Sequence, residues 1–352
     1  MSIIINGTGS YIPPKVKLNS AFLSNNFIDN DGNSFGIENQ EIIEKFQSIT
    51  GIKQRLYVSN DLKSSDIATE AAKKAIKDSK INSESIDYII LAHNIGDINY
   101  GTKQMDAMPA LAARVKANLE IKNPSCVAYD ILFGCPGWLE GMIQAKSFIK
   151  SGMAKRCLVI GTETLSRVID PSDRDGMIFA DGAGAVIIES SEKSGGILSN
   201  KSATYSNEGI VNYIYYGESN SNNIDKTKYI KMQGHKVYEF ALSKVPNAMK
   251  ECLDESGKKI TDLKKIFIHQ ANLKMEKALV KRFYKLYDSE PPNNVLPTNI
   301  ERFGNSSVAT IPTLFDLVIK ENYGGHKINN GDLILFASVG AGMNINALTY
   351  QF

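Results

Sequence analysis

Apolar residues recur with two different spacings along the chain, and the two spacings alternate. Helical spacing predicts helices over residues 67–76, 111–119, 237–253, 274–286 and 311–319. Short continuous apolar runs predict strands over residues 88–92, 157–160, 182–188, 266–268 and 333–336. Strands that alternate with helices in this way are typical of a layered α/β protein whose helices cover its sheets.

A short sequence pattern occurs twice, once in each half of the chain. Residues 87–94 (DYIILAHN) resemble residues 265–272 (KIFIHQAN), and residues 133–135 (FGC) resemble residues 303–305 (FGN). The two motifs keep the same order at a similar separation in both copies, which indicates a duplicated α/β unit. The Ser-, Asn- and Gly-rich stretch 190–223 lies between the copies.

The duplication makes a prediction about three side chains. Cys135 and Asn305 are pseudo-equivalent, and His269 stands in the second copy of the histidine motif. If equivalent turns meet at the interface between the two units, these three residues come together there. We expect an N-terminal half over residues 1–190 that carries the cysteine, and a C-terminal half over 191–352 that carries the histidine and the asparagine.

Composition narrows the functional classes mainly by exclusion. The chain has 352 residues and a net charge of +2, and no basic run is interleaved with aromatic residues, so nucleic acid is not an expected partner. No apolar run approaches the roughly 20 residues of a spanning helix. Four cysteines without a CxxC pair and only four histidines predict neither a disulfide scaffold nor a metal site. Together with the absence of a signal peptide, this predicts a cytoplasmic protein.

Cys135 stands in a setting that favours a reactive thiol. In residues 129–141 (YDILFGCPGWLEG) a strand-like run ends at Gly134, and Pro136 takes the predicted first helical position. The free N–H groups and the dipole of a helix N-terminus favour the thiolate, which is the nucleophile. Free cysteines are most often core residues, and we assign the others to the core: Cys126, Cys157 and Cys252.

His269 and the loops around it are weaker signals when each is taken alone. His269 follows the predicted strand 266–268, and strand ends in α/β proteins are where ligands gather. The segment 304–307 (GNSS) has the composition of a turn that caps a helix. The glycines at 181–185 and 338–342 lack the complete dinucleotide fingerprint, but the second loop can offer a backbone N–H to a reacting carbonyl.

Together these segments resemble the three catalytic signatures of the β-ketoacyl-acyl-carrier-protein synthase III family of the thiolase superfamily. The signatures are GCPG around Cys135, HQAN from His269 and GNSS around Asn305. Further similar segments run nearly end to end: TGI at 50–52, DPSDR at 170–174, DGAGA at 181–185, MQG at 232–234 and GAG at 340–342. The resemblance implies a homodimer with a duplicated thiolase-like fold, layered α-β-α-β-α with two pseudo-equivalent halves.

The resemblance also implies a decarboxylative Claisen condensation that needs neither a metal nor an organic cofactor. Cys135 would take an acyl group from acyl-CoA or acyl carrier protein as a thioester. His269 and Asn305 would donate hydrogen bonds to the thioester oxygen of a malonyl-type carrier protein and stabilise the enolate left by carbon dioxide. The carbanion would attack the acyl group to give a 3-oxoacyl product, while the backbone N–H groups of Cys135 and Ala341 hold the oxyanion.

Departures from the family pattern bear on the substrate. Lys45 and Ile49 stand where relatives carry a Trp and an Arg at the CoA adenine, so Arg174 is retained without that aromatic partner. Val339 replaces a Phe of the acyl pocket, and Met108 replaces an aromatic residue that the family presents to the partner's acyl pocket. Because Met is flexible, these changes predict an acyl chain bulkier than acetyl and favour a specialised fatty-acid or polyketide-like pathway over fatty-acid initiation.

The predicted helix 274–286 is basic, and the resemblance implies that it docks the acidic carrier protein. Lys274 stands where the family has an Arg, and Lys277 and Lys281 share its helical face. Arg282 and Lys285 add to the charge. For each of these residues a solvated helix face is the alternative.

Three other functions compete with condensation. A papain-like protease also uses Cys, His and Asn, but the FGCPGW turn does not match its signature. Acyl transfer or thioester hydrolysis through Cys135, without carbon–carbon bond formation, stays open. A non-catalytic partner subunit is disfavoured because all three catalytic positions are present.

Overall fold

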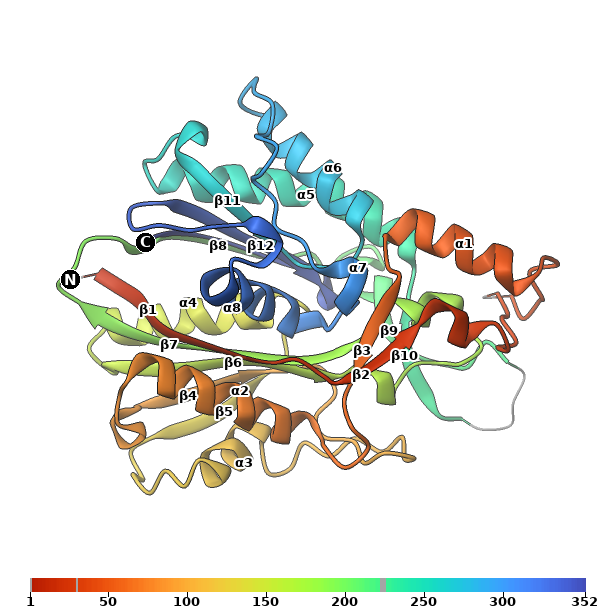
Figure 1. The fold of residues 1–352 in the computed structure, drawn as a ribbon, viewed down its shortest axis with the longest axis horizontal. Coiled ribbons are helices and arrows are strands. Elements are labelled where there is room, and N and C mark those ends of the chain that lie inside the picture. The colour runs from red at the N-terminus through yellow and green to blue at the C-terminus, as the bar shows by residue number, and fades with distance from the viewer. Residues whose placement is uncertain (1, 30, 222–225) are drawn as a thin grey trace.

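The computed structural model describes residues 2–29, 31–221 and 226–352, and it contains two stacked sheets (Figure 1). The first sheet has the strand order β1 (Ser2–Tyr11), β7 (Asp181–Ser191), β6 (Arg156–Thr164), β4 (Tyr88–Ala92) and β5 (Val127–Ile131). The second has the order β11 (Leu263–Ile268), β12 (Leu333–Gly340), β13 (Asn344–Gln351) and β8 (Gly196–Thr204).

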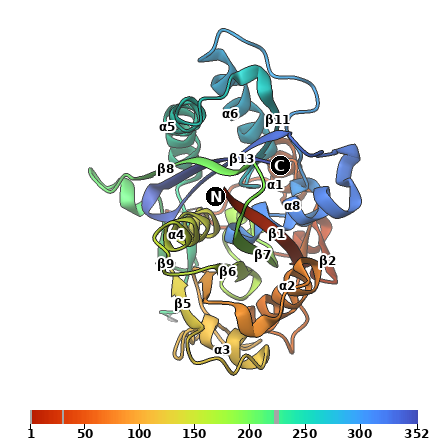
Figure 2. The same cartoon turned by 90° about the vertical axis from the view of Figure 1, so that its left-hand side faces the viewer.

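Helices form three layers around these sheets, as the end-on view shows (Figure 2). The central layer between the sheets holds α4 (Gly137–Lys150) and α8 (Thr310–Glu321). The outer layers hold α2 (Ser64–Ser79) and α3 (Leu111–Asn118) on the first sheet, and α5 (Gly234–Glu255) and α6 (Leu273–Lys285) on the second. The predicted α-β-α-β-α layering is confirmed.

The two sheets repeat the same pattern of strand directions. β6 runs parallel to β4 and antiparallel to β7, which runs antiparallel to β1. β12 runs parallel to β11 and antiparallel to β13, which runs antiparallel to β8. Beside β11, the Val295 carbonyl oxygen accepts a hydrogen bond from the Ile266 N–H at 2.8 Å, so this segment takes the edge position that β5 holds in the first sheet. The duplication predicted from the repeated motifs is therefore present.

The predicted elements agree with the observed ones. Each predicted helix and strand overlaps an observed one, and 88–92 coincides with β4. The stretch 190–223, the candidate for a boundary near mid-chain, contains β8 and β9 (Ile214–Glu218), and its last two residues lie outside the described residues. The first sheet uses residues 2–191 and the second residues 196–351. The division into halves over 1–190 and 191–352 stays a prediction.

Smaller elements flank the layers near one end of the sheets. They are β2 (Lys15–Leu18) paired with β3 (Gln54–Tyr57), β9 paired with β10 (Lys228–Met232), α1 (Asn39–Thr50) and α7 (Ile300–Phe303). No helix in the described ranges has the length and hydrophobicity that crossing a bilayer requires.

An aromatic cluster packs the central layer against the second sheet. The Trp138 ring of α4 meets the Phe336 ring of β12 edge-on at 5.9 Å, and Phe315 of α8 meets the same ring at 5.2 Å. All three side chains are buried. Edge-to-face aromatic pairs add to the gain from burial alone. The cluster therefore positions α4 and α8, whose N-terminal ends carry the residues described next.

Candidate active site

Cys135 lies in a tight turn between β5 and α4. Gly134 before it has a φ of 66°, and a Cβ atom there would lie 2.6 Å from the backbone nitrogen of Ala341, so only glycine fits. The helix begins at Gly137 with Pro136 as its N-cap, one residue later than predicted. A Cβ atom at Gly340 would lie 2.8 Å from the Cys135 Cβ. The turn and the loop from Gly340 are therefore in close backbone contact.

His269 follows the last residue of β11 and is buried. Its backbone N–H donates to the Ala337 carbonyl at 3.0 Å, which places the ring at the end of the second sheet. The Nδ1 atom lies 2.7 Å from the Thr310 hydroxyl. Burial lowers the pKa of the imidazole to about 3, because removal from water disfavours the charged ring. At neutral pH the ring is therefore uncharged.

Asn305 stands in the turn between α7 and α8. Its backbone bridges to the chain around Phe179: the Asn305 N–H donates to the Ile178 carbonyl at 2.9 Å, and the Ala180 N–H donates to the Asn305 carbonyl at 2.8 Å. The side-chain Oδ1 accepts from the Ser307 N–H at 2.8 Å. This bond orients the amide so that its NH2 group remains as the hydrogen-bond donor.

The three predicted residues line one cavity of about 200 Å³. Cys135 comes from the first half of the chain, and His269 and Asn305 come from the second. Their meeting at one cavity, predicted from the repeated motifs, is confirmed. Among the cysteines only Cys135 is partly accessible, and the other three are buried, as expected for core residues.

A chain of hydrogen bonds leads from the nucleophile to a buried acid. The Ser307 hydroxyl donates to the Cys135 sulfur at 3.3 Å and accepts from the Asn94 amide at 3.1 Å. The same amide group donates to the Glu163 carboxyl group. Glu163 is fully buried, and burial raises its pKa to about 8, so it is mostly protonated at neutral pH.

The resting thiol differs from the prediction. Burial raises the pKa of the Cys135 thiol to about 12, outweighing the Ser307 hydrogen bond, which lowers it. The helix N-terminus was expected to favour the thiolate, but desolvation of the sulfur has the larger effect. In the resting structure Cys135 is therefore a protonated thiol next to a neutral imidazole.

The residues predicted for the oxyanion site and the acyl pocket are found in different places. Ala341 and Val339 both line the cavity beside Cys135. Met108 does not line the cavity of its own chain; its side chain is 89% exposed. That position agrees with the expectation that Met108 faces a partner subunit, which no observation on the single chain tests.

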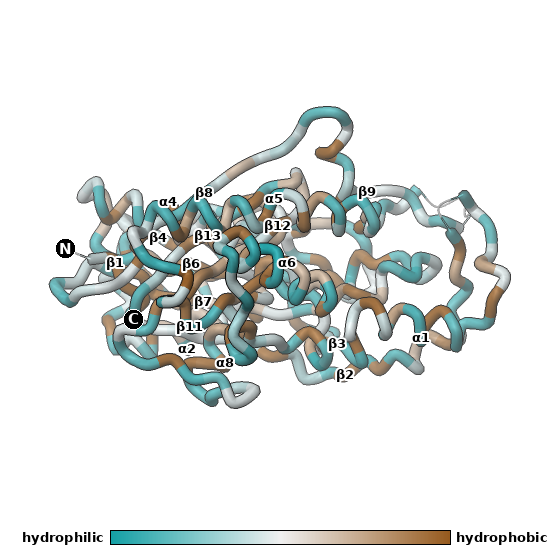
Figure 3. Tube along the Cα trace, turned by 90° about the horizontal axis from the view of Figure 1, so that it is seen from above, coloured by the Kyte–Doolittle hydropathy of each residue, from teal (hydrophilic) through white to brown (hydrophobic). Residues whose placement is uncertain are grey.

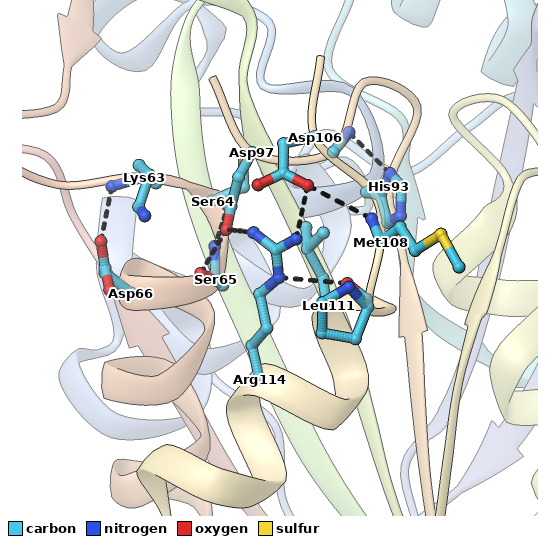
Figure 4. A network of polar contacts seen from close by, with 12 residues as sticks. Lys63, Ser64, Ser65, Asp66, His93, Asp97, Asp106, Met108, Leu111 and Arg114 are labelled. Carbon is cyan, nitrogen blue, oxygen red and sulfur yellow. Dashed lines mark hydrogen bonds and ion pairs between the residues drawn. The ribbon is translucent and has the colours of Figure 1, made fainter. Parts of the chain in front are cut away.

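A polar network holds the loop that carries Met108 (Figure 4). The Arg114 guanidinium forms ion pairs with Asp97 at 2.8 Å and with Asp106 at 2.7 Å, and it donates to the Pro109 carbonyl at 3.1 Å. The buried Asp97 also accepts from the Ser65 N–H and hydroxyl. The network ties the loop to α2 and α3, and the Met108 side chain points away from it.

Arg174 has an aromatic partner that the sequence comparison missed. Its guanidinium carbon lies 4.6 Å from the centre of the Phe35 ring, and Arg174 is half-exposed outside the cavity. Lys45 stands at the position of the family's Trp, and Phe35 from another loop supplies an aromatic ring beside Arg174 instead. Lys45, at the expected Trp position, pairs instead with Glu41 at 2.7 Å on the surface of α1.

The basic residues of α6 form an exposed face that begins near the cavity. Lys274, Lys277 and Lys281 are all exposed, whereas Met275 on the opposite side of the same helix lines the cavity. The view onto this helix shows hydrophilic residues recurring along it (Figure 3). A Cβ atom at Gly51 would lie 2.9 Å from the Leu273 Cβ, so the TGI turn at 50–52 packs against the start of the helix.

Several residues at the site were not predicted. Asn94 lies in the first copy of the repeated motif and Ser307 lies in the GNSS segment, but no role was predicted for either. Thr310 begins α8 and contacts His269. Tyr215 and Tyr216 line the cavity from β9, a strand that the apolar pattern did not predict.

Comparison with families of known proteins agrees with this geometry. A family model described as 3-oxoacyl-[acyl-carrier-protein] synthase III matches residues 129–206, and the model of its C-terminal part matches residues 253–352. A β-ketoacyl-[acyl-carrier-protein] synthase III from Vesicomyosocius okutanii is 32% identical over 349 residues, covering 99% of this chain and 98% of the relative. One from Porphyra purpurea is 35% identical over 338 residues, covering 91% and 96%.

Solved structures show the same fold. The 3-oxoacyl-[acyl-carrier-protein] synthase III of Aquifex aeolicus VF5 aligns with a TM-score of 0.81 at 30% identity, covering 100% of both chains. The priming β-ketosynthase of the R1128 polyketide pathway aligns with a TM-score of 0.82, covering 100% of this chain and 96% of that one. At 22% identity the second likeness shows the fold alone.

Proposed function

Because the chain belongs to the 3-oxoacyl-[acyl-carrier-protein] synthase III family, we propose that it condenses an acyl thioester with a malonyl-type carrier protein. The product is a 3-oxoacyl carrier protein, and carbon dioxide and the thiol of the acyl donor are released. The observation that carries the proposal is the cavity at which one thiol and two neutral hydrogen-bond donors meet: Cys135, His269 and Asn305.

In the first step Cys135 accepts the acyl group. Its sulfur attacks the thioester carbonyl, the bond to the donor sulfur breaks, and the thiol proton leaves with the departing CoA or phosphopantetheine thiol. The backbone N–H groups of Cys135 and Ala341 hold the carbonyl oxygen while it carries negative charge. The close backbone contact between the turn and the loop supports this arrangement, because Gly134 approaches the Ala341 nitrogen and Gly340 approaches the Cys135 nitrogen.

In the second step His269 and Asn305 act on the malonyl thioester. The ring N–H at Nε2 and the amide NH2 donate to the thioester oxygen, which becomes an enolate oxygen as carbon dioxide leaves. The carbanion then attacks the acyl carbonyl, the bond to the Cys135 sulfur breaks, and the resulting thiolate takes up a proton from water. The low pKa of His269 supports this role, because a neutral ring gives its proton to the enolate less readily than an imidazolium. Removing one such donor typically costs ~10²–10³ in rate.

Two features of the surface suit the binding of the acyl donor and the extender. The Arg174–Phe35 pair offers a cation and an aromatic face, which suits the nucleotide end of acyl-CoA. The exposed lysines Lys274, Lys277 and Lys281 suit an acidic carrier protein, whose association a basic face accelerates. Both kinds of donor therefore stay within the proposal.

We propose that the active form is a homodimer. We also propose that it accepts starter acyl groups bulkier than acetyl. Among the described residues β5 is an edge strand of the first sheet, Leu132 directly follows it, and the side chains of Leu132 and Met108 are exposed. An unpaired edge next to exposed apolar side chains suits pairing with a second copy. Val339, which is smaller than Phe, and the mostly apolar lining of the cavity support a bulkier starter and the use in a specialised pathway.

The test separates condensation from hydrolysis. The protein is incubated with a panel of acyl-CoAs and acyl carrier proteins and weighed intact. We expect a mass gain that Cys135→Ala abolishes, and then release of carbon dioxide and a 3-oxoacyl product when malonyl carrier protein is added. Release of free acid without a 3-oxo product selects the hydrolase alternative. No mass gain with any donor contradicts both functions.

A further inference from the structure

Tyr216 is a partly buried tyrosine that lines the cavity, and the condensation does not use it. Its hydroxyl oxygen is buried and has no hydrogen-bond partner among the described residues. Of the residues that line the cavity in the described part of the chain, Tyr216 alone has such a buried, unpartnered side-chain atom. A buried hydroxyl without a partner is costly, since it has given up its bonds to water.

The wall that carries Tyr216 is otherwise apolar. Tyr216 on β9 pairs with Ile230 on β10, and Ile214 pairs with Met232. Because side chains alternate along a strand, these four lie on one face of the hairpin, and all four line the cavity. Ile178 and Phe179 also line the cavity. Of the two tyrosines that this hairpin contributes to the cavity, Tyr216 alone has a hydroxyl that is buried without a partner among the described residues.

The hairpin that bears Tyr216 is firmly anchored. Lys231, on its other face, is buried and forms ion pairs with Asp170 at 2.5 Å and Asp173 at 3.1 Å. Asp170 also accepts from the Asn220 N–H just beyond β9, at 2.9 Å, and the Ile230 N–H donates to the Val168 carbonyl at 3.0 Å. These contacts fix the position of the hairpin, and with it the position of Tyr216 at the cavity.

The Tyr216 hydroxyl is available as a donor. Burial and the nearby charge of Glu163 both raise the pKa of the phenol, so it keeps its proton throughout the physiological range. A neutral phenol that lacks a partner satisfies its proton best with an oxygen acceptor on the ligand. Tyr215 beside it differs, because its side chain is 41% exposed and reaches solvent.

We propose that the cavity selects a starter acyl group whose chain carries an oxygen substituent, a hydroxyl or an oxo group, which accepts a hydrogen bond from the Tyr216 hydroxyl. This inference rests on the proposed function, because it names the substrate class of the acylation of Cys135. Sites built to hydrogen-bond a substrate oxygen discriminate strongly against the analogue that lacks it, since the site's polar group is then left unpaired.

The experiment compares matched thioesters that need no carrier. N-acetylcysteamine thioesters of hexanoic acid and of its 3-hydroxy, 4-oxo and 5-oxo derivatives are offered singly, and the rate of acylation of Cys135 is followed by intact mass. We expect at least one oxygenated thioester to react at least tenfold faster than the hexanoyl thioester. Tyr216→Phe should reduce that ratio to within about twofold while keeping the hexanoyl rate. Tyr100→Phe, a control at an exposed tyrosine that does not line the cavity, should keep the ratio.

The following outcomes would overturn the proposed role of Tyr216. If hexanoyl reacts as fast as every oxygenated thioester, or if Tyr216→Phe keeps the preference, Tyr216 does not select the starter, although the condensing function still stands. A loss of the hexanoyl rate in Tyr216→Phe together with the loss of preference would assign Tyr216 a packing role and overturn the inference. If no thioester acylates Cys135, the inference fails together with the proposed function.

Discussion

At the scale of single residues, Thr310 is a hydrogen-bond partner of the His269 ring. The Thr310 hydroxyl has one proton and two acceptors within reach, the His269 Nδ1 at 2.7 Å and the Ser307 carbonyl at 3.0 Å. The enolate requires the ring proton on Nε2, and in that tautomer Nδ1 accepts the Thr310 proton, which the Ser307 carbonyl accepts when Nδ1 carries the ring proton. Thr310 is thus a positioning residue that acts through His269.

Thr310→Val should affect one step of the reaction only. Without the hydroxyl, His269 loses the hydrogen bond at its Nδ1, and we expect release of carbon dioxide from malonyl carrier protein to fall roughly 10- to 100-fold, somewhat less than for loss of a donor itself. Acylation of Cys135, measured by intact mass, should stay within a few fold. Thr310→Ser keeps the hydroxyl and should restore decarboxylation. Wild-type decarboxylation in Thr310→Val would contradict this role.

The raised pKa of the Cys135 thiol predicts how its alkylation depends on pH. Since only the thiolate reacts and the pKa is about 12, the reactive fraction rises about tenfold per pH unit at every pH well below that value. The rate of iodoacetamide labelling, followed by mass with Cys135→Ala as background, should climb from pH 6 to pH 9 without a plateau. A plateau near pH 7 would show the lowered pKa expected from the helix N-terminus alone.

At the scale of elements, long-range polar contacts place the segments around the cavity. The loop with Met108 is held by Arg114 of α3, and the β9–β10 hairpin is held by Asp170 and Lys231. Both anchors include a buried carboxylate, Asp97 or Asp170, that pairs with a cation on a neighbouring helix or strand. Removing one partner of such a pair leaves the other buried without compensation, which costs more than the pair contributes.

Arg114→Ala should therefore destabilise the protein measurably. It leaves the Asp97 carboxylate buried with only its Ser65 bonds, and we expect a loss of about 2 kcal/mol in the free energy of unfolding, seen as a lower Tm. Lys73→Ala, which removes an exposed pair with Glu70, is the control and should cost no more than about 0.5 kcal/mol. Equal Tm values for the two variants would show that the network around Asp97 does not stabilise the loop.

At the scale of the whole molecule, the duplicated fold could be predicted because the same short sequence patterns occur in both halves of the chain. The apolar runs of β4 and β11 and the motifs after them repeat in order, and local spacing is sufficient to detect a repeat. The β9–β10 hairpin could not be predicted in this way, since Lys231 and the polar residues of β9 obscure its apolar face. The Arg174–Phe35 contact joins loops 139 residues apart in the sequence, which no local pattern records.

The oligomeric state is also a property of the whole molecule. With β5 as an edge strand among the described residues and the side chains of Leu132 and Met108 exposed, we expect two copies to associate through this side. Sedimentation equilibrium should give twice the chain mass of 38.7 kDa. Leu132→Glu, which places a charge at the proposed contact, should shift the equilibrium toward the single chain. A wild-type protein that sediments as one chain at micromolar concentration would exclude the homodimer.

The most direct test asks whether the two halves of the molecule divide the reaction between them. Cys135 comes from one half, and Asn305 comes from the other and serves only the malonyl step in our account. We measure, for Asn305→Ala, the intact-mass gain with the acyl donor and the release of labelled carbon dioxide from carboxyl-labelled malonyl carrier protein. The account predicts acylation within about threefold of wild type and decarboxylation lowered by ~10²–10³. An equal loss of both steps, or of neither, would contradict it.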